Sequence, residues 1–215
     1  MEQEKRKIAY LVIGKGMNRL RQYLTEKDSY IIGIDKGAYL LASEGLFFDE
    51  AVGDFDSVDE KEYQDIEKYA GKITKLNPMK DESDTAHAYE RYKDKGDRII
   101  LLGAIQGKRI EHFIANMFLL LKDEKVCFVD ENSNIYSLSA QKTPYLFKRK
   151  DAYYSFFPIE EAILTLEGFQ YPLKEKVLAK GDALGLSNEL VAKEGSLLLE
   201  KGKLLVIETK KEANS

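Results

Sequence analysis

Residues 98–130 read RIILLGAIQGKRIEHFIANMFLLLKDEKVCFVD, and this stretch contains three segments of different rhythm. RIILLGAI and KVCFVD are short apolar runs without polar alternation, which is typical of strands that are buried on both faces. Between them, Arg109 to Leu121 carries a broad apolar face at helical spacing, which predicts a helix. Strand, helix and strand in this order predict one unit of a parallel sheet whose crossover is helical.

The same alternation extends back to the N-terminus. Further strands are expected at KIAYLVIG, YIIGI, Glu50 to Gly53 and KITKL. Helices are expected at Asn18 to Lys27, Gly37 to Glu44, Asp59 to Ala70 and Asp84 to Lys95. Ser57-Val-Asp-Glu60 has the pattern of a capping box before the third of these helices. We therefore predict a doubly wound, mostly parallel α/β domain over residues 1–132.

The spacing of apolar residues changes after Asn132, and no long segment with apolar residues at helical spacing follows. Short segments rich in β-branched and aromatic residues alternate with Gly, Pro, Asn and charged turns, as in IYSLSA, DAYYSFFPI and AILTLEGF. SLLLEKGKLLVIE predicts a hairpin that turns near Lys201-Gly202. Residues 133–215 are therefore expected to form an all-β sandwich, with a half-barrel as the related alternative.

Composition excludes several classes of protein. The 33 Lys and Arg residues and the 37 Asp and Glu residues give a net charge of −4, so there is no basic footprint for nucleic acid. The longest uncharged apolar stretch, His112 to Leu121, is about half of what a membrane span requires. The N-terminus has no signal-peptide pattern, and the single cysteine, Cys127, excludes an internal disulfide. A cytoplasmic protein without membrane or nucleic-acid partners is expected.

Charged residues follow four consecutive strands of the predicted sheet. Ligands of open α/β sheets bind beyond the carboxyl ends of the strands, so these residues should share one edge. Several carboxylates on one edge repel each other unless a cation lies between them, and Mg²⁺ commonly bridges carboxylates to phosphates. Cationic side chains in the same loops would neutralise the remaining phosphate charge. The residues concerned are Asp35, Asp54, Asp56, Lys80, Asp84, Lys108 and Arg109.

Structural roles for the same residues remain open on this pattern alone. Asp and Gly after strands are common as turn residues and helix caps. No P-loop motif is present, and Gly14-Lys-Gly16 lacks the third glycine of a dinucleotide fingerprint. Asp54-Phe-Asp56 resembles the start of haloacid-dehalogenase phosphatases, but Glu50-Ala-Val-Gly before it is not a fully apolar strand. His112 lies near Arg109 in sequence, and it fits either a place near the site or polar packing.

Several segments, in this order, resemble thiamine pyrophosphokinases. They are GIDKGAYLL, AVGDFDSV, KDESDTAHA and GKRIEHFIANMFLL in the first half, and GFQYPL, GDALGLSNEL and KGKLLVIE in the second. The resemblance implies an α/β domain followed by a β-sandwich that binds thiamine. It also implies transfer of the pyrophosphoryl group of ATP to the hydroxyl of thiamine, which gives thiamine diphosphate and AMP. A homodimer with active sites at the subunit interface is implied as well.

The resemblance assigns roles to individual positions. Asp54, Asp56 and Asp84 match the family's Mg²⁺-binding carboxylates. Asp35 matches an Asp near the metal and phosphates, which could accept the hydroxyl proton. The remaining matches are Lys80 and Ser83 as polyphosphate contacts, Lys108 as an additional cation, Arg109 as the arginine of a Gly-Gly-Arg-x-Asp-His segment, and Ser187 with Asn188 as the thiamine-binding pair.

Departures from the family pattern keep two other functions open. Glu111 replaces the usual Asp before His112, Lys108 replaces a Gly, and Ala86 stands where a Glu is common. The chain also has no Trp to stack on thiamine, so a Tyr, a Phe or an aliphatic wall would have to serve. A different Mg²⁺-dependent phosphotransferase or phosphatase would release ADP or phosphate. A sensor that kept the pocket without the chemistry would bind ATP and thiamine and form no product.

Overall fold

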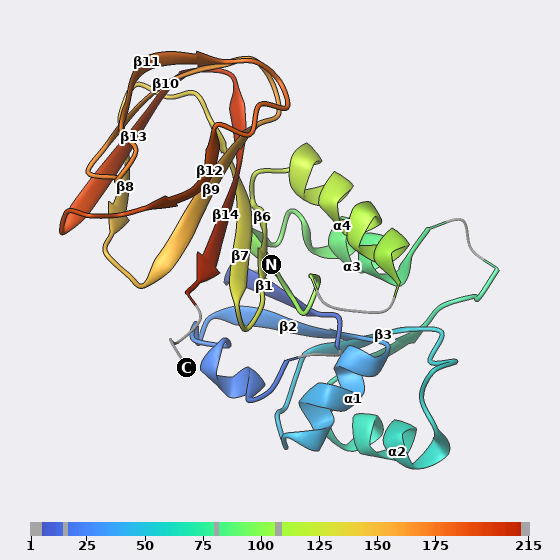
Figure 1. Ribbon diagram of the computed structural model, residues 1–215. Coiled ribbons are helices and arrows are strands. Elements are labelled where there is room, and N and C mark those ends of the chain that lie inside the picture. The colour runs from blue at the N-terminus through green and yellow to red at the C-terminus, as the bar shows by residue number, and fades with distance from the viewer. Residues whose placement is uncertain (1–5, 15–16, 80–81, 106–108, 212–215) are drawn as a thin grey trace. The chain divides into compact units, whose positions relative to one another are not determined.

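The structure is a computed structural model that describes residues 6–14, 17–79, 82–105 and 109–211 (Figure 1). It divides into two compact units, Met1–Glu131 and Asn132–Ser215. Within the described residues, no helix is both long enough and apolar enough to cross a membrane.

The first unit contains a parallel sheet. In its described part the strand order is β6-β5-β1-β2-β3-β4, and every neighbouring pair is parallel. Figure 1 shows α1 and α2 on one face of this sheet and α3 and α4 on the other, which confirms the doubly wound α/β prediction. The strands are β1 (Arg6–Val12), β2 (Ser29–Ile34), β3 (Glu50–Gly53), β4 (Ile73–Lys75), β5 (Gly96–Leu102) and β6 (Val126–Val129). The helices are α1 (Lys36–Ser43), α2 (Glu60–Tyr69), α3 (Asp84–Tyr92) and α4 (Ile110–Lys122).

Helices on both faces bury most of the central strands. Leu11, Ile32, Val52 and Leu101 are each 0% exposed, and all four residues of β3 are buried. This is why the strand sequences lack polar alternation. Burial on both faces removes the apolar side chains of these strands from water, and each fully buried side chain contributes about 1.5–3 kcal/mol.

The helix expected at Asn18 to Lys27 does not form. Only a single 3-10 turn, η1 (Leu20–Gln22), is present there. Arg19 has a left-handed backbone (φ 58°), which no helix interior tolerates, and the N–H of Leu20 donates to the carboxylate of Glu44 at 2.9 Å. This single turn already buries the side chain of Leu20, so its burial does not require a longer helix.

The capping box before α2 lies two residues later than expected. Asp59, not Ser57, caps the helix: its Oδ1 accepts from the N–H of Glu62 at 2.9 Å. The carboxylate of Glu62 in turn accepts from the N–H of Asp59 at 3.0 Å. Both Ser57-x-x-Glu60 and Asp59-x-x-Glu62 fit the capping pattern, and Asp accepts at least as well as Ser in this position.

The second unit is an all-β sandwich, as predicted. One sheet has the order β12-β9-β14-β7 and the other β11-β10-β13-β8, and all the pairs are antiparallel. Phe169 lies in the core between the sheets, with its ring 5.5–5.7 Å from the rings of Phe147, Tyr154 and Phe156. The strands are β7 (Ser133–Ser139), β8 (Tyr145–Lys148), β9 (Ala152–Pro158), β10 (Ala162–Glu167), β11 (Leu173–Leu178), β12 (Gly185–Glu189), β13 (Glu194–Lys201) and β14 (Lys203–Lys210).

The hairpin predicted for SLLLEKGKLLVIE is wrong. β13 pairs with β10 and β8, whereas β14 pairs with β7 and β9, so the two strands belong to opposite sheets. Gly202 between them has φ 83°, and a Cβ there would lie 2.2 Å from the carbonyl oxygen of Glu161. Each strand thereby becomes a central strand of its own sheet, and their leucines meet in the shared core.

A buried carboxylate fixes the beginning of β3. Glu50 is 2% exposed and accepts hydrogen bonds from the hydroxyls of Thr74 and Tyr92. The ammonium of Lys72 lies 3.2 Å and the Nε of Arg91 3.0 Å from its oxygens. Burial acts to raise the pKa of Glu50, but the hydrogen bonds and the two cations outweigh it, so the pKa lies below its ordinary value of 4.5.

Replacing Gly202 with Ala should destabilise the protein by about 3 kcal/mol, because both the backbone conformation and the contact with Glu161 oppose a side chain. Gly181 is a matched control: its φ is 84°, but a Cβ there would meet nothing within 4 Å. Gly181→Ala should therefore cost only about 1 kcal/mol. Urea unfolding measures the free energy of unfolding of both variants. Equal losses of stability would contradict the role of the turn at Gly202, which leads the chain from one sheet to the other (the sheet-crossing turn).

Replacing Glu50 with Gln should cost about 3 kcal/mol near neutral pH, because the buried network loses its negative charge. The folded pKa of Glu50 is lowered, so its stabilising contribution is complete above pH 4.5 and is lost as the pH falls through the folded value. The difference between wild type and variant should therefore shrink as the pH falls below 4.5. Urea unfolding at several pH values tests this, and a constant difference would contradict it.

Candidate functional site

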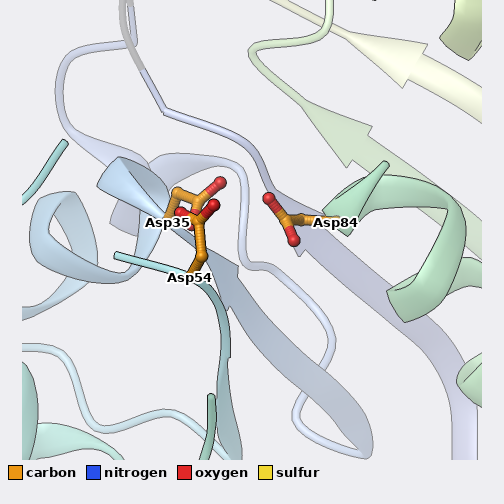
Figure 2. Close-up of side chains that lie close together, drawn as sticks. All are labelled: Asp35, Asp54 and Asp84. Atoms are coloured by element: carbon orange, nitrogen blue, oxygen red, sulfur yellow. The ribbon is translucent and has the colours of Figure 1, made fainter. Parts of the chain in front are cut away.

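Three carboxylates converge at the carboxyl ends of the parallel strands. One ligand oxygen each from Asp35, Asp54 and Asp84 lies within 4.8 Å of the other two (Figure 2). Asp35 follows β2, Asp54 follows β3, and Asp84 is the first residue of α3. All three side chains are half-buried. The fold thus brings together residues that are up to 49 positions apart (84 − 35), as the strand-end argument predicts.

The backbone around Asp35 holds its side chain toward the group. Asp35 has φ 48° and ψ −118°, which side-chain-bearing residues seldom adopt, and its N–H donates to the carbonyl of Val52 at 3.0 Å. Its Oδ1 accepts from the N–H of Phe55 at 3.4 Å. A Cβ on Gly53 would lie 1.9 Å from that Oδ1, so only glycine at residue 53 leaves room for the carboxylate.

Asp54 and Asp56 differ in their surroundings. Oδ1 of Asp54 accepts from the N–H of Asp56 at 3.1 Å, which fixes the Asp54 side chain next to its own loop. Asp56 is exposed, and its carboxylate is not part of the three-residue group. The structure therefore brings Asp54 and Asp84 of the predicted ligand set together with Asp35, while Asp56 stays outside.

The first turn of α3 places Asp84. Ser83 caps this helix: its hydroxyl oxygen accepts from the N–H of Ala86 at 3.1 Å. A carboxylate in the first turn is favoured by the positive end of the helix dipole, by about 0.3–1 kcal/mol. Ser83 therefore precedes Asp84 at the start of α3, and its hydroxyl oxygen caps the helix. Its predicted contact with the polyphosphate stays a prediction.

The three carboxylates line a cavity of about 200 Å³. His112, whose place the sequence left open, also lines it from α4. Glu82 and Thr85 also line the cavity; they were not predicted as site residues, although both lie in the KDESDTAHA segment beside Ser83 and Asp84. The lining residues are Ile13, Ile34, Asp35, Asp54, Pro78, Glu82, Ser83, Asp84, Thr85 and His112.

Arg109 lies at the N-cap of α4 and is mostly exposed. Its Nε donates to the carboxylate of Glu111 at 2.7 Å, and this hydrogen bond lowers the pKa of Glu111. Arg109 is not among the residues that line the cavity. The two predicted lysines, Lys80 and Lys108, lie outside the described residues.

Ser187 and Asn188 lie on β12 of the second unit. Asn188 is 3% exposed, and its amide oxygen accepts from the N–H of Tyr171 at 3.0 Å. Its amide nitrogen donates to the carbonyl of Tyr171 at 2.9 Å. Ser187 is exposed and has φ 53°, and its N–H donates to the hydroxyl of Ser155 at 3.0 Å.

The donor set of the first unit suits a hard divalent cation. Mg²⁺ and Ca²⁺ take oxygen ligands, and Mg²⁺ is usually held by one or two carboxylates together with substrate phosphates and water. Asp35, Asp54 and Asp84 offer three carboxylates in an open cavity, with no sulfur or nitrogen ligand in their group. These residues fit a magnesium ion that also contacts a phosphate ligand.

Comparisons with known proteins agree with the geometry. The family models "Thiamin pyrophosphokinase, catalytic domain" and "Thiamin pyrophosphokinase, vitamin B1 binding domain" match residues 21–129 and 141–204. The thiamine pyrophosphokinase of Bacillus subtilis is 34% identical over 189 residues, which cover 85% of this chain and 88% of that protein.

Solved structures show the same similarity. A crystal structure of the Bacillus subtilis thiamine pyrophosphokinase has a TM-score of 0.85 at 32% identity, covering 96% of this chain and 100% of the other. The thiamin pyrophosphokinase of Geobacillus thermodenitrificans has a TM-score of 0.82 at 27% identity, covering 96% and 98%. The resemblance seen in the sequence is thereby confirmed, and this chain belongs to the thiamin pyrophosphokinase family.

Proposed function

We propose that this protein transfers the pyrophosphoryl group of ATP to the hydroxyl of thiamine, and that the Asp35–Asp54–Asp84 cavity holds the phosphates. Family membership supports the reaction, because both family models match in order along the chain. The observation that carries the site is the convergence of three carboxylates at the ends of the parallel strands. The thiamine hydroxyl oxygen bonds to the β-phosphorus of ATP and releases its proton to water, the bond from that phosphorus to the α–β bridging oxygen breaks, and AMP leaves with that oxygen.

Asp54 and Asp84 are proposed as Mg²⁺ ligands, with Asp35 as the third. Mg²⁺, when bound, would neutralise phosphate charge and orient the polyphosphate. The position of Asp35 within the group favours a ligand role over the proton-acceptor role that the sequence suggested. Asp56 remains a predicted ligand, and variants of it can be compared directly with those of Asp54.

Cationic side chains are proposed to bind the phosphates. Arg109 is exposed at the start of α4, the helix that also supplies His112 to the cavity, so its guanidinium can donate to phosphate oxygens as charge moves to the leaving AMP. Lys80 and Lys108 are proposed for the same task on the strength of the family pattern. Transfer of this kind requires mainly positioning and charge stabilisation, so no nucleophilic side chain is needed.

The thiamine-binding half is proposed to lie in the second unit. The family model that describes vitamin B1 binding matches residues 141–204, which include Ser187 and Asn188. We also propose a homodimer with active sites at the subunit interface and a cytoplasmic location, as the family resemblance implies.

The reaction is tested by incubating the purified protein with Mg²⁺, ATP and thiamine and resolving the products by mass spectrometry. Thiamine diphosphate and AMP in equal amounts are expected. ADP with thiamine monophosphate would refute attack at the β-phosphorus. Release of ADP or phosphate without a thiamine product would indicate another phosphotransferase or a phosphatase, and binding without any product would indicate a sensor.

Asp54→Asn and Asp84→Asn should each lower kcat by at least about a hundredfold, because each removes a charged metal ligand. Asn has nearly the same shape, and both side chains are only half-buried, so thermal unfolding should change little. Asp56→Asn, made in parallel, shows how much the exposed carboxylate of Asp56 contributes to turnover. Near-normal turnover of the Asp54 and Asp84 variants at saturating Mg²⁺ would contradict the assignment.

Gly53→Ala should lower kcat by at least about tenfold, because the new methyl group would occupy the space of Asp35 Oδ1. The apparent affinity for Mg²⁺, measured from the metal dependence of turnover, should fall as well. Gly71→Ala is a suitable control, since its Cβ would lie 3.1 Å from the carbonyl oxygen of Asp49, away from the three carboxylates. Equal activity of the two variants would argue against the role of Gly53.

A further inference from the structure

Residues 54–57 form the loop that leads from β3 toward α2, and we call it the acidic loop because it carries Asp54 and Asp56. The bond from the N–H of Asp56 to the Asp54 carboxylate fixes that side chain relative to the loop. The N–H of Val58 donates to the carbonyl of Phe55 at 3.2 Å, which closes the turn. The place of the Asp54 carboxylate relative to the other two carboxylates therefore depends on what holds the loop as a whole.

Phe55 anchors the middle of the acidic loop. Its side chain is 6% exposed, and its ring lies 5.4 Å from the ring of Tyr63 on α2, nearly perpendicular to it. This contact is apolar, so it resists withdrawal of the loop from α2. The beginning of the loop is fixed as well, because it follows directly from β3 in the sheet.

Lys36 holds the end of the acidic loop. It is the first residue of α1 and follows Asp35 directly, so its backbone is joined to one of the three carboxylate residues. Its Nζ donates to the carbonyl of Ser57 at 3.3 Å and to Oε1 of Glu62 on α2 at 2.6 Å. The same ammonium lies 5.2 Å from the centre of the Tyr39 ring. One cation thus connects α1, the acidic loop and α2.

The ion pair of Lys36 with Glu62 is shielded from water more than another pair of the same helix. The side chains of Lys36 and Glu62 are 29% and 17% exposed. Lys68 and Asp65, 2.8 Å apart on α2, are 65% and 32% exposed. Water and salt screen an exposed pair, which contributes little, whereas a partly buried pair is screened less. Removal of Lys36 should therefore have a local effect that removal of Lys68 lacks.

We propose that Lys36 is a positioning residue, whose ammonium holds the acidic loop against α2 and so keeps the Asp54 carboxylate beside those of Asp35 and Asp84. Three carboxylates within 4.8 Å of one another repel each other, and that repulsion acts to move the loop away from the group. Lys36 opposes this movement through Ser57 and Glu62, without contacting the phosphates. This inference deepens the proposed function and rests on it, since Asp54 is taken as a metal ligand.

Steady-state kinetics test the role of the ammonium. Lys36→Met removes the charge and keeps the length of the side chain, so the apparent affinity for Mg²⁺ should fall about tenfold, while the KM for ATP at saturating Mg²⁺ changes little. Lys36→Arg should restore most of the affinity, because a guanidinium can donate to both acceptors. Lys68→Met is the matched control and should leave both values unchanged.

Two kinetic results would contradict the proposal. An unchanged Mg²⁺ dependence in Lys36→Met would overturn it. A raised KM for ATP at saturating Mg²⁺ would mean that the ammonium binds phosphate directly, which would overturn the positioning role.

Hydrogen exchange measures the position of the loop without metal or substrate. The N–H groups of Phe55, Asp56, Val58 and Asp59 are all hydrogen-bonded in or next to the acidic loop. Lys36→Met should speed the exchange of these amides about tenfold, whereas Lys36→Arg and Lys68→Met should not. Mass spectrometry of peptides covering residues 54–59 detects the change. Unchanged exchange in Lys36→Met, or an equal rise along the whole chain, would refute a local effect on the loop.

A second variant separates the ion pair from the capping box. Glu62→Gln keeps an acceptor for the N–H of Asp59, since Gln also fits a capping box, and removes the charge that faces Lys36. It should lower the Mg²⁺ affinity less than Lys36→Met does, because the bond from Lys36 to Ser57 remains. The double variant should be no worse than Lys36→Met alone. Independent, additive effects would overturn a joint action of the two residues.

These outcomes are distinct from failure of the proposed function. A wild-type protein that forms no thiamine diphosphate would refute the function, and the exchange measurement would still show whether Lys36 holds the loop. A wild-type protein that forms thiamine diphosphate, together with a Lys36→Met variant of unchanged Mg²⁺ dependence and unchanged exchange, would refute this inference alone.

Discussion

The parallel pairing of β2 with β3 is the constraint on which the candidate site depends. Ile34 lies opposite Val52, so the residues that follow these strands emerge side by side at one edge of the sheet. The hydrogen bond from the N–H of Asp35 to the carbonyl of Val52 extends this pairing by one residue. Carboxylates that close together repel each other, and it is the buried, hydrogen-bonded sheet that keeps them in place. A cation between them would turn this repulsion into attraction.

Much of the first unit could be predicted from the sequence because its strands are buried on both faces. Short continuous apolar runs bounded by turn residues then indicate strands, and most strand ends are located within a few residues. The proximity of Asp35, Asp54 and Asp84 follows from those ends. The position of Asp56 outside the group does not follow, because it depends on the positive φ of Phe55 between the two acids, 60°. Such a backbone conformation has no signature in a non-glycine residue.

The failures of prediction in the rest of the chain share one cause. A local pattern predicts a local structure there, whereas contacts between residues far apart in the sequence decide the outcome. The apolar spacing of residues 18–27 suggested a helix, yet Arg19 adopts a left-handed backbone and Glu44 binds the next N–H. The amide of Asn188 is bound to the backbone of Tyr171, 17 positions earlier in the chain, and its predicted contact with thiamine stays a prediction. Sequence alone carries no signal for which partner such an amide selects.

The sheet-crossing turn at Gly202 also affects the order in which the two units can fold during synthesis. β14 follows that turn, and it supplies the pairing for both β7 and β9. One sheet of the sandwich therefore lacks its central strand until Lys210 has left the ribosome. The strands of the first unit are complete about 80 residues earlier, since β6 ends at Val129. The α/β unit can thus begin to fold before β14 is available. Until then the apolar faces of strands β7 to β13 remain exposed.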